Sequence, residues 1–147
     1  MKFQAEITIN LPIHKVIELF DNAENLKQWQ PDLISFEHLS GEPGQAGAKS
    51  RLIYKMGKRK ITMVETITRK NLPFEFSGTY EAKGVFNEVK NFFTPIGPDK
   101  TKYSTDNLFK FKGFMKVVAL LMPGAFKKQS QKFLEQFKAF AEEAGRE

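Results

Sequence analysis

The sequence contains no cysteine and only two histidines and one tryptophan. The absence of cysteine excludes disulfides, thiolate metal sites and a cysteine nucleophile. The two histidines, His14 and His38, are far apart in the chain and belong to different predicted elements, so they do not form a metal-binding cluster. We therefore expect neither a metal site nor a cofactor.

Motifs of two common enzyme classes are also missing. The chain has no Gly-x-Ser-x-Gly element to carry a hydrolase nucleophile and no P-loop to bind a nucleotide. The glycines of GEPGQAG (41–47) precede a predicted strand, whereas those of a dinucleotide-binding motif open a helix. The sequence therefore does not indicate a hydrolase with a serine nucleophile, a P-loop nucleotide-binding protein or a dinucleotide-binding protein.

Long apolar runs are absent as well. The longest uncharged apolar stretch is VVALLMPGAF (117–126), which is about half of the roughly 20 residues needed to cross a bilayer. The opening residues, MKFQAEITIN, alternate between polar and apolar and lack the apolar core of a signal peptide. We expect no transmembrane segment and a cytoplasmic protein.

The 147 residues, 41% of them hydrophobic, are typical of one globular domain, here predicted to span 1–147. A chain of this length buries roughly 70% of its unfolded surface. We expect a monomer or a weak dimer.

The net charge of +6 is concentrated in one segment, KSRLIYKMGKRK (49–60), which has six basic and no acidic residues. Such a segment is either a solvated hairpin, whose lysines discourage aggregation, or a weak contact for phosphates, acidic lipids or an acidic partner. The nearby aromatic residues belong to apolar strand faces and not to a stacking platform, so no nucleic acid partner is expected.

The first third of the chain reads as a strand followed by two short helices. Residues 2–9 alternate, and Asn10 with Pro12 indicates an N-cap and the first turn of a helix. A second short helix is predicted at about 23–28, and Pro31 then disfavours helical backbone at the preceding residue. Trp29 lies at this exit, and we expect its indole to wedge the helix pair against the sheet, with ligand contact as the alternative.

The remainder reads as six strands and one long helix. Alternation of apolar and polar residues predicts strands at 33–39, 48–56, 61–67, 74–80, 84–94 and 103–111. For 84–94 the inward phase, meaning which alternate residues face the core, is ambiguous. After Gly113 the period changes, and beyond Pro123-Gly124 an aromatic stripe extends from Phe126 to Phe140. Consecutive strands with short turns form an antiparallel meander, whose apolar face the C-terminal helix must cover.

Three segments of the chain are distinctive: INLPIHKVIELFDN, LKQWQPDLISF and PGQAGAKSRL. With the opening strand, they resemble the SRPBCC superfamily, which includes START-related and birch-allergen-like proteins and the polyketide cyclase/dehydrase and lipid transport type. The resemblance covers nearly the whole chain. It implies an α+β helix-grip fold, in which a curved antiparallel sheet of six to seven strands (order β-α-α-β6-α) wraps around the long C-terminal helix. It also implies a cavity for a hydrophobic or amphipathic small molecule, lipid- or polyketide-like.

Two other functions remain open. The first is an enzyme of the cyclase or dehydratase type, in which Glu65 and a tyrosine hydroxyl move protons. Glu65 shares the phase of an apolar strand face, and the alternative is an outward position or an ion pair with Arg51 or a lysine. The second is a protein-interaction module resembling the chaperone-activating members, with 49–60 as the contact surface.

The predicted cavity wall combines apolar residues with a few polar ones, which either orient a ligand or are satisfied locally. Open volume is expected near Gly78, where a side chain is missing, and hinges for ligand entry are expected at Gly113 and Pro123-Gly124. The predicted lining residues are Trp29, Tyr54, Met63, Glu65, Phe76, Gly78, Tyr80, Tyr103, Thr105, Asn107, Phe109, Met122, Phe126 and Phe133.

Overall fold

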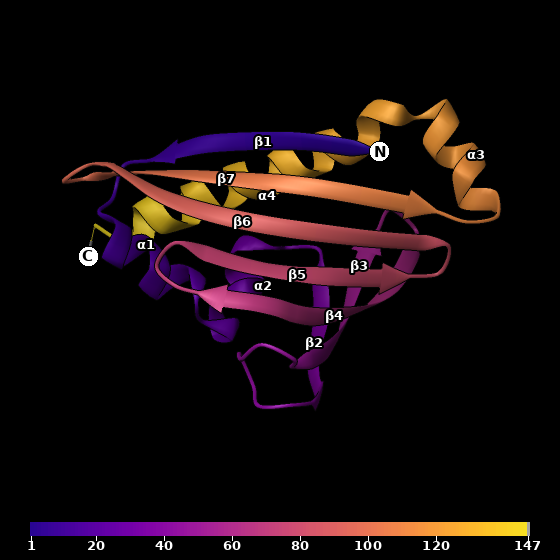
Figure 1. Cartoon of the computed structure of the whole chain (residues 1–147), viewed down its shortest axis with the longest axis horizontal. Coiled ribbons are helices and arrows are strands. Elements are labelled where there is room, and N and C mark those ends of the chain that lie inside the picture. Colours follow the sequence, from indigo (N-terminus) through magenta and orange to yellow (C-terminus); the bar gives the residue numbers. More distant parts are fainter. Residues whose placement is uncertain (147) are drawn as a thin grey trace.

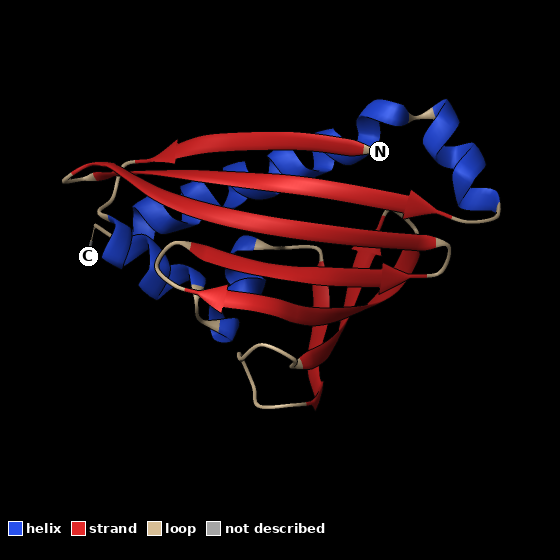
Figure 2. Cartoon of the chain, in the orientation of Figure 1, coloured by secondary structure: helices blue, strands red, loops and turns tan. Residues whose placement is uncertain are grey.

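Seven strands form one antiparallel sheet in the computed structural model, which describes residues 1–146 (Figure 2). The strands are β1 (Lys2–Ile9), β2 (Leu33–Ser40), β3 (Lys49–Met56), β4 (Arg59–Asn71), β5 (Glu75–Ala82), β6 (Val85–Gly97) and β7 (Lys100–Phe111). The helices are α1 (Ile13–Phe20), the 3-10 turn η1 (Ala23–Asn25), α2 (Leu26–Trp29), α3 (Phe114–Leu121) and α4 (Pro123–Ala144).

The sheet order is β1-β7-β6-β5-β4-β3-β2, so β2 to β7 form a meander and β1 pairs with the last strand. The sheet is strongly curved, and β2 and β3 run steeply across the direction of β6 and β7 (Figure 1). Bulges in β2, β4 and β6 increase the local twist. Helix α4 lies on the concave side and makes its main contacts with β1 and α2. The predicted helix-grip architecture is confirmed.

The N-cap of helix α1 lies two residues later than predicted. Pro12 occupies the N-cap position in extended conformation, and its carbonyl oxygen accepts hydrogen bonds from the backbone N–H groups of Lys15 and Val16 at 3.0 and 3.1 Å. The prediction that Asn10 caps this helix is therefore wrong. Its backbone N–H and its Nδ2 donate instead to Oε2 of Glu142, at 2.9 and 3.2 Å, and thereby tie the start of α1 to α4.

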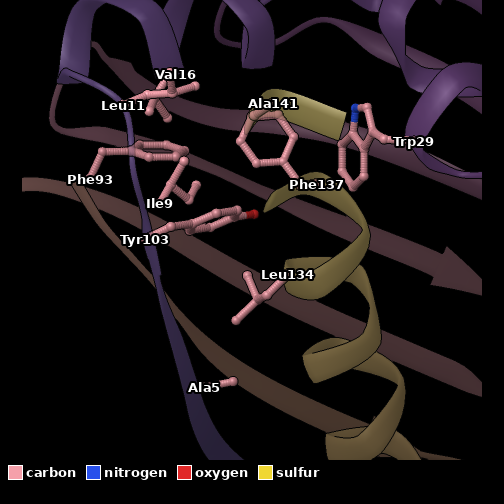
Figure 3. Packing of buried hydrophobic residues seen from close by; sticks show 10 residues of the cluster. All are labelled: Ala5, Ile9, Leu11, Val16, Trp29, Phe93, Tyr103, Leu134, Phe137 and Ala141. Atoms are coloured by element: carbon pink, nitrogen blue, oxygen red, sulfur yellow. The ribbon is translucent and has the colours of Figure 1, made fainter. Parts of the chain in front are cut away.

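One end of the space between sheet and helix is solidly packed (Figure 3). The ring of Phe137 on α4 is fully buried and lies 5.5 Å from Phe20, 5.2 Å from Trp29 and 5.9 Å from Tyr103, measured between ring centroids. We call this group the closed-end cluster; its buried members are Ala5, Ile9, Leu11, Val16, Trp29, Phe93, Tyr103, Leu134, Phe137 and Ala141.

The indole of Trp29 belongs to this cluster and packs edge-on against Phe137 (Figure 3). It thus joins α2 to α4. Its Nε1–H is buried and has no hydrogen-bond partner among residues 1–146. A buried indole N–H normally has a partner, so this group is an exception in the cluster.

A separate helix, α3, precedes the long helix (Figure 1). Gly113, with φ of +59°, turns the chain out of β7 in a conformation that favours glycine. Helix α3 then projects away from the sheet, and Leu120 is 83% exposed. The predicted break is present but lies at Met122: α3 ends at Leu121, and Pro123 and Gly124 form the first turn of α4. None of the helices within residues 1–146 is both long and apolar enough to cross a bilayer.

Candidate functional site

The cross-strand register determines which side chains face α4. Tyr103 of β7 belongs to the closed-end cluster, so its face is the inner one, and Thr105 and Asn107 share it. Opposite these three residues, β6 places Phe93, Asn91 and Val89. This pairing resolves the ambiguous phase of 84–94: the odd-numbered residues of β6 face inward at these positions.

A row of polar side chains crosses the inner face. Ser50 pairs with Glu65, Glu65 with Tyr80, and Tyr80 with Asn87, on four successive strands from β3 to β6. We call these four residues the polar row. These four polar side chains lie on an otherwise apolar concave face, so each needs a hydrogen-bond partner, either from the protein or from a ligand.

Within the polar row, the hydroxyl of Tyr80 donates a hydrogen bond of 2.7 Å to Oε2 of Glu65. Burial raises the pKa of the Glu65 carboxyl, and the hydrogen bond from Tyr80 offsets part of this effect. Burial and the adjacent carboxylate also raise the pKa of Tyr80 well above its usual value. The pair can therefore hold or release a proton in a poorly solvated place, which is a requirement for an acid or a base.

The raised pKa of Glu65 makes stability depend on pH. The folded protein binds this proton more tightly than the unfolded chain, so stability falls as pH rises from the normal carboxyl pKa through the raised one. Glu65→Gln removes this loss. We expect the variant to have a higher unfolding temperature than the parent at pH 8, with the difference shrinking towards pH 4.

The matched control is Glu81→Gln, which changes an exposed carboxylate next to Tyr80 on the opposite face of β5. Its unfolding temperature should follow the parent at both pH values. If the Glu65 variant has the same pH profile as the control, the carboxyl is not desolvated in the way described.

Further amides extend the polar surface towards β7. Asn87 donates from Nδ2 to Oδ1 of Asn107 at 3.3 Å, and Asn107 donates to Oγ1 of Thr105 at 3.2 Å. Tyr103 donates from its hydroxyl to Oδ1 of Asn91 at 3.1 Å. Asn87 and Asn91 were not among the predicted site residues, because the phase of their strand was not resolved.

The inner face is not covered evenly. At the closed end its residues are buried, but Glu65, Tyr80, Asn87 and Val89 keep partial solvent exposure although they face inward. Helix α4 rests mainly on β1 and α2, away from β4 and β5. We call these four half-buried residues the uncovered inner face. Apolar side chains in the same phase, including Met63 and Phe109, flank it.

The structure distributes the predicted lining residues among several environments. Tyr54 donates to Oε1 of Gln30 at 2.6 Å and packs with Leu52. Trp29 and Tyr103 are in the closed-end cluster, and Met122 is 56% exposed between α3 and α4. The predicted residues that share the inner phase of the sheet are Tyr54, Met63, Glu65, Phe76, Gly78, Tyr80, Tyr103, Thr105, Asn107 and Phe109.

Two aromatic residues of α4 also approach the sheet. The ring of Phe126 lies 5.0 Å from that of Phe109 and 4.9 Å from that of Phe111, and the ring of Phe133 lies 6.4 Å from that of Tyr54. These contacts place the start and the middle of the helical stripe over the concave face.

Gly78 does not provide the open volume expected from its missing side chain. A Cβ at this position would lie 2.9 Å from the carbonyl oxygen of Thr66 on the neighbouring strand. The glycine therefore allows β4 and β5 to approach each other beside the bulge in β4. The expectation of space at this point is wrong, because backbone occupies it.

A hollow of about 420 Å³ lies where β7, α3 and the start of α4 meet. Its wall is mostly apolar, and it does not include the polar row, which lies on other strands. Its lining residues are Met1, Phe109, Phe111, Lys116, Ala119, Leu120 and Pro123. Phe109 thus borders both the inner face and this hollow.

No group of three or more histidine, aspartate or glutamate side chains within residues 1–146 is placed to hold a metal ion. The features of the site that can bind or react with a ligand are therefore an apolar concave wall, a row of hydrogen-bonding groups and one carboxyl with a raised pKa.

Residues 1–142 match the family described as polyketide cyclase / dehydrase and lipid transport. No curated protein sequence matches the chain. The similarity to solved structures is extensive in shape and low in sequence.

A protein of Thermus thermophilus is 18% identical with a TM-score of 0.80, and the match covers 98% of this chain and 99% of that one. The Zhui aromatase/cyclase of Streptomyces sp. R1128 is 13% identical with a TM-score of 0.78, covering 97% and 93%. A START superfamily protein of Mycobacterium smegmatis is 14% identical with a TM-score of 0.71, covering 95% and 98%. Together with the family match, these likenesses confirm the predicted SRPBCC resemblance.

Proposed function

The chain belongs to the polyketide cyclase / dehydrase and lipid transport family, and from this premise we propose that it binds an apolar or amphipathic small molecule, lipid- or polyketide-like, on the uncovered inner face. One observation carries the proposal. Glu65, Tyr80, Asn87 and Val89 face α4 and yet remain partly exposed, so the concave side of the sheet retains accessible surface.

The energetics of such binding are favourable but modest. Covering roughly 400 Å² of ligand surface at about 25 cal/mol/Å² gives a gross gain near 10 kcal/mol. The costs of association and of ordering the ligand reduce this to an affinity of roughly micromolar order.

The polar row gives such a ligand an orientation. The carboxyl of Glu65 and the amides of Asn87 and Asn107 are hydrogen-bonded to other side chains of the same face. A polar group of the ligand can replace one of these side chains as the hydrogen-bond partner. An apolar body then lies on the flanking Met63 and Phe109. This division between apolar area and a few polar groups is typical of small-molecule sites.

Val89→Trp tests the proposal directly, because the new indole fills the concave side between Gly78 and Asn107. The probe is 1-anilinonaphthalene-8-sulfonate, followed by its fluorescence. We expect its affinity to fall by about tenfold or more, because the added ring occupies the apolar surface that the probe would cover.

The matched control is Lys90→Trp, which adds the same side chain to the next residue, exposed on the outer face. It should leave the affinity within about twofold of the parent, since that face is not part of the site. Equal affinities of the parent and the Val89 variant would overturn the proposal.

A second function is favoured by one specific contact, the hydrogen bond from Tyr80 to Glu65. A cyclase- or dehydratase-type enzyme would use this pair to move a proton on a bound polyketide-like substrate. In an enzyme, Glu65→Gln abolishes turnover and preserves probe binding, whereas a carrier has no turnover to lose.

A further inference from the structure

Helix α3 concentrates exposed apolar side chains in one short segment. Leu120 is 83% exposed, Phe114 and Leu121 are each 75% exposed, and Val117 and Met122 are about half exposed. The main contacts of this helix with other elements are with β7 and α4. Large apolar side chains gathered in this way on a surface indicate an interaction site.

The chain around this helix is basic. Residues 107–134 contain no aspartate or glutamate, and their lysines are Lys110, Lys112, Lys116, Lys127, Lys128 and Lys132. Apolar residues 117–122 thus lie between lysines on both sides.

Other cationic residues lie at the same end of the sheet. The antiparallel register places the β3–β4 turn and the β5–β6 turn at the end where β7 leaves for α3. The first turn carries Lys58, Arg59 and Lys60, and the second carries Lys83. The amino group of Met1 is also there and donates to the carbonyl oxygen of Phe109. We call this region, together with α3, the α3 end.

The opposite end of the sheet has mixed charge. Its turns and adjoining residues include Glu42 and Asp99 as well as Lys100. Lys70 there is paired with Asp21 at 3.3 Å. At the α3 end, Glu81 lies two residues before Lys83, and Asp32 pairs with Lys132 at 3.9 Å. Positive charge nevertheless predominates at the end that carries the exposed apolar helix.

We propose that the α3 end docks on the surface of an anionic lipid bilayer. The apolar side chains of α3 enter the boundary between headgroups and acyl chains, and the surrounding lysines and arginine contact the acidic headgroups. Lysine suits this position because its stem lies along apolar surface while its ammonium reaches the headgroups. With eight residues, α3 lies on the bilayer and does not span it.

The apolar surface of α3 could also be covered by a second copy of the chain, but the positive charge of the α3 end argues against this. A symmetric dimer through α3 would bring together two ends at which basic residues outnumber acidic ones, and like charges facing each other oppose association. An anionic bilayer satisfies both the apolar and the cationic parts of the surface.

The test is co-sedimentation of the full chain with vesicles, either of phosphatidylcholine alone or of phosphatidylcholine with phosphatidylglycerol. We expect binding only to the vesicles that contain phosphatidylglycerol, and we expect it to weaken as salt is added. Equal binding to both compositions, or none to either, would overturn the proposal.

Two double variants separate the apolar from the cationic contribution. Leu120→Ser with Leu121→Ser, and Lys112→Gln with Lys116→Gln, should each weaken binding to phosphatidylglycerol vesicles by about tenfold or more. The apolar control is Phe74→Ser with Ile96→Ser, which changes two exposed apolar residues (56% and 51%) at the opposite end of the sheet. The control should bind as the parent does.

The oligomeric state provides an independent check. If the parent is a dimer in solution that the leucine variant converts to a monomer, α3 is a self-association surface and the proposal fails. The inference does not depend on the proposed function. Val89→Trp should leave vesicle binding unchanged, and the leucine variant should retain probe affinity at the inner face in the absence of vesicles.

Discussion

Replacing Phe137 with alanine should lower the free energy of unfolding by about 3–5 kcal/mol. The ring is fully buried and lies within 6 Å of the rings of Phe20, Trp29 and Tyr103, so its removal leaves a cavity that rigid neighbours cannot easily fill. A loss of this size is a large part of the stability of a typical domain. Denaturant unfolding, followed by circular dichroism, measures it.

The control is Phe114→Ala on α3, where the ring is 75% exposed. This variant should change stability by no more than about 0.5 kcal/mol. Similar losses for the two variants would mean that α3 is packed against the protein in solution, and that the closed-end cluster is not the main source of stability.

Gly78→Ala should destabilise the protein by about 1–3 kcal/mol. The added methyl group would lie 2.9 Å from the carbonyl oxygen of Thr66, and the backbone of two paired strands must move apart to accommodate it. Thermal unfolding of the variant measures the effect.

Gly124→Ala is the matched control, because a Cβ there meets no atom within 4 Å and the residue lies in the first turn of α4. This substitution should stabilise the protein by about 0.4–1 kcal/mol, since alanine restricts the unfolded chain more than glycine does. If both glycine variants change stability in the same direction, the close approach of β4 and β5 is not what requires Gly78.

Much of the fold follows from local patterns in the sequence. The turns at GEPGQAG (41–47) and IGPDK (96–100) separate alternating segments, and the period changes from that of strands to that of a helix after Gly113. The aromatic stripe on the last helix correctly predicts which side of α4 faces the sheet, because Phe133 and Phe137 both pack there.

The inward phase of β6 could not be predicted from these patterns. Both alternating sets of residues in this strand mix apolar and polar side chains: Val85, Val89 and Phe93 alternate with Phe86 and Phe92. Alternation alone therefore does not indicate which set faces inward, and the pairing with β7 decides it. Asn87 and Asn91 could not be assigned to the inner face for this reason.

Two other features of the structure depend on tertiary neighbours that the sequence does not show. Asn10 has the side chain of a cap, but Glu142 of α4 attracts its donors. The exposure of α3 could not be predicted either, since an apolar segment such as 114–122 is compatible with a buried helix as well as with an exposed one.

The central claim is that a small apolar molecule binds on the uncovered inner face. The most direct measurement is a titration of the isotopically labelled protein with 1-anilinonaphthalene-8-sulfonate, followed by amide chemical shifts in nuclear magnetic resonance spectra. The account predicts saturable shifts at Glu65, Tyr80 and Val89, and their disappearance in Val89→Trp. Shifts confined to α3 and the adjoining hollow, with an unaffected inner face, would contradict it.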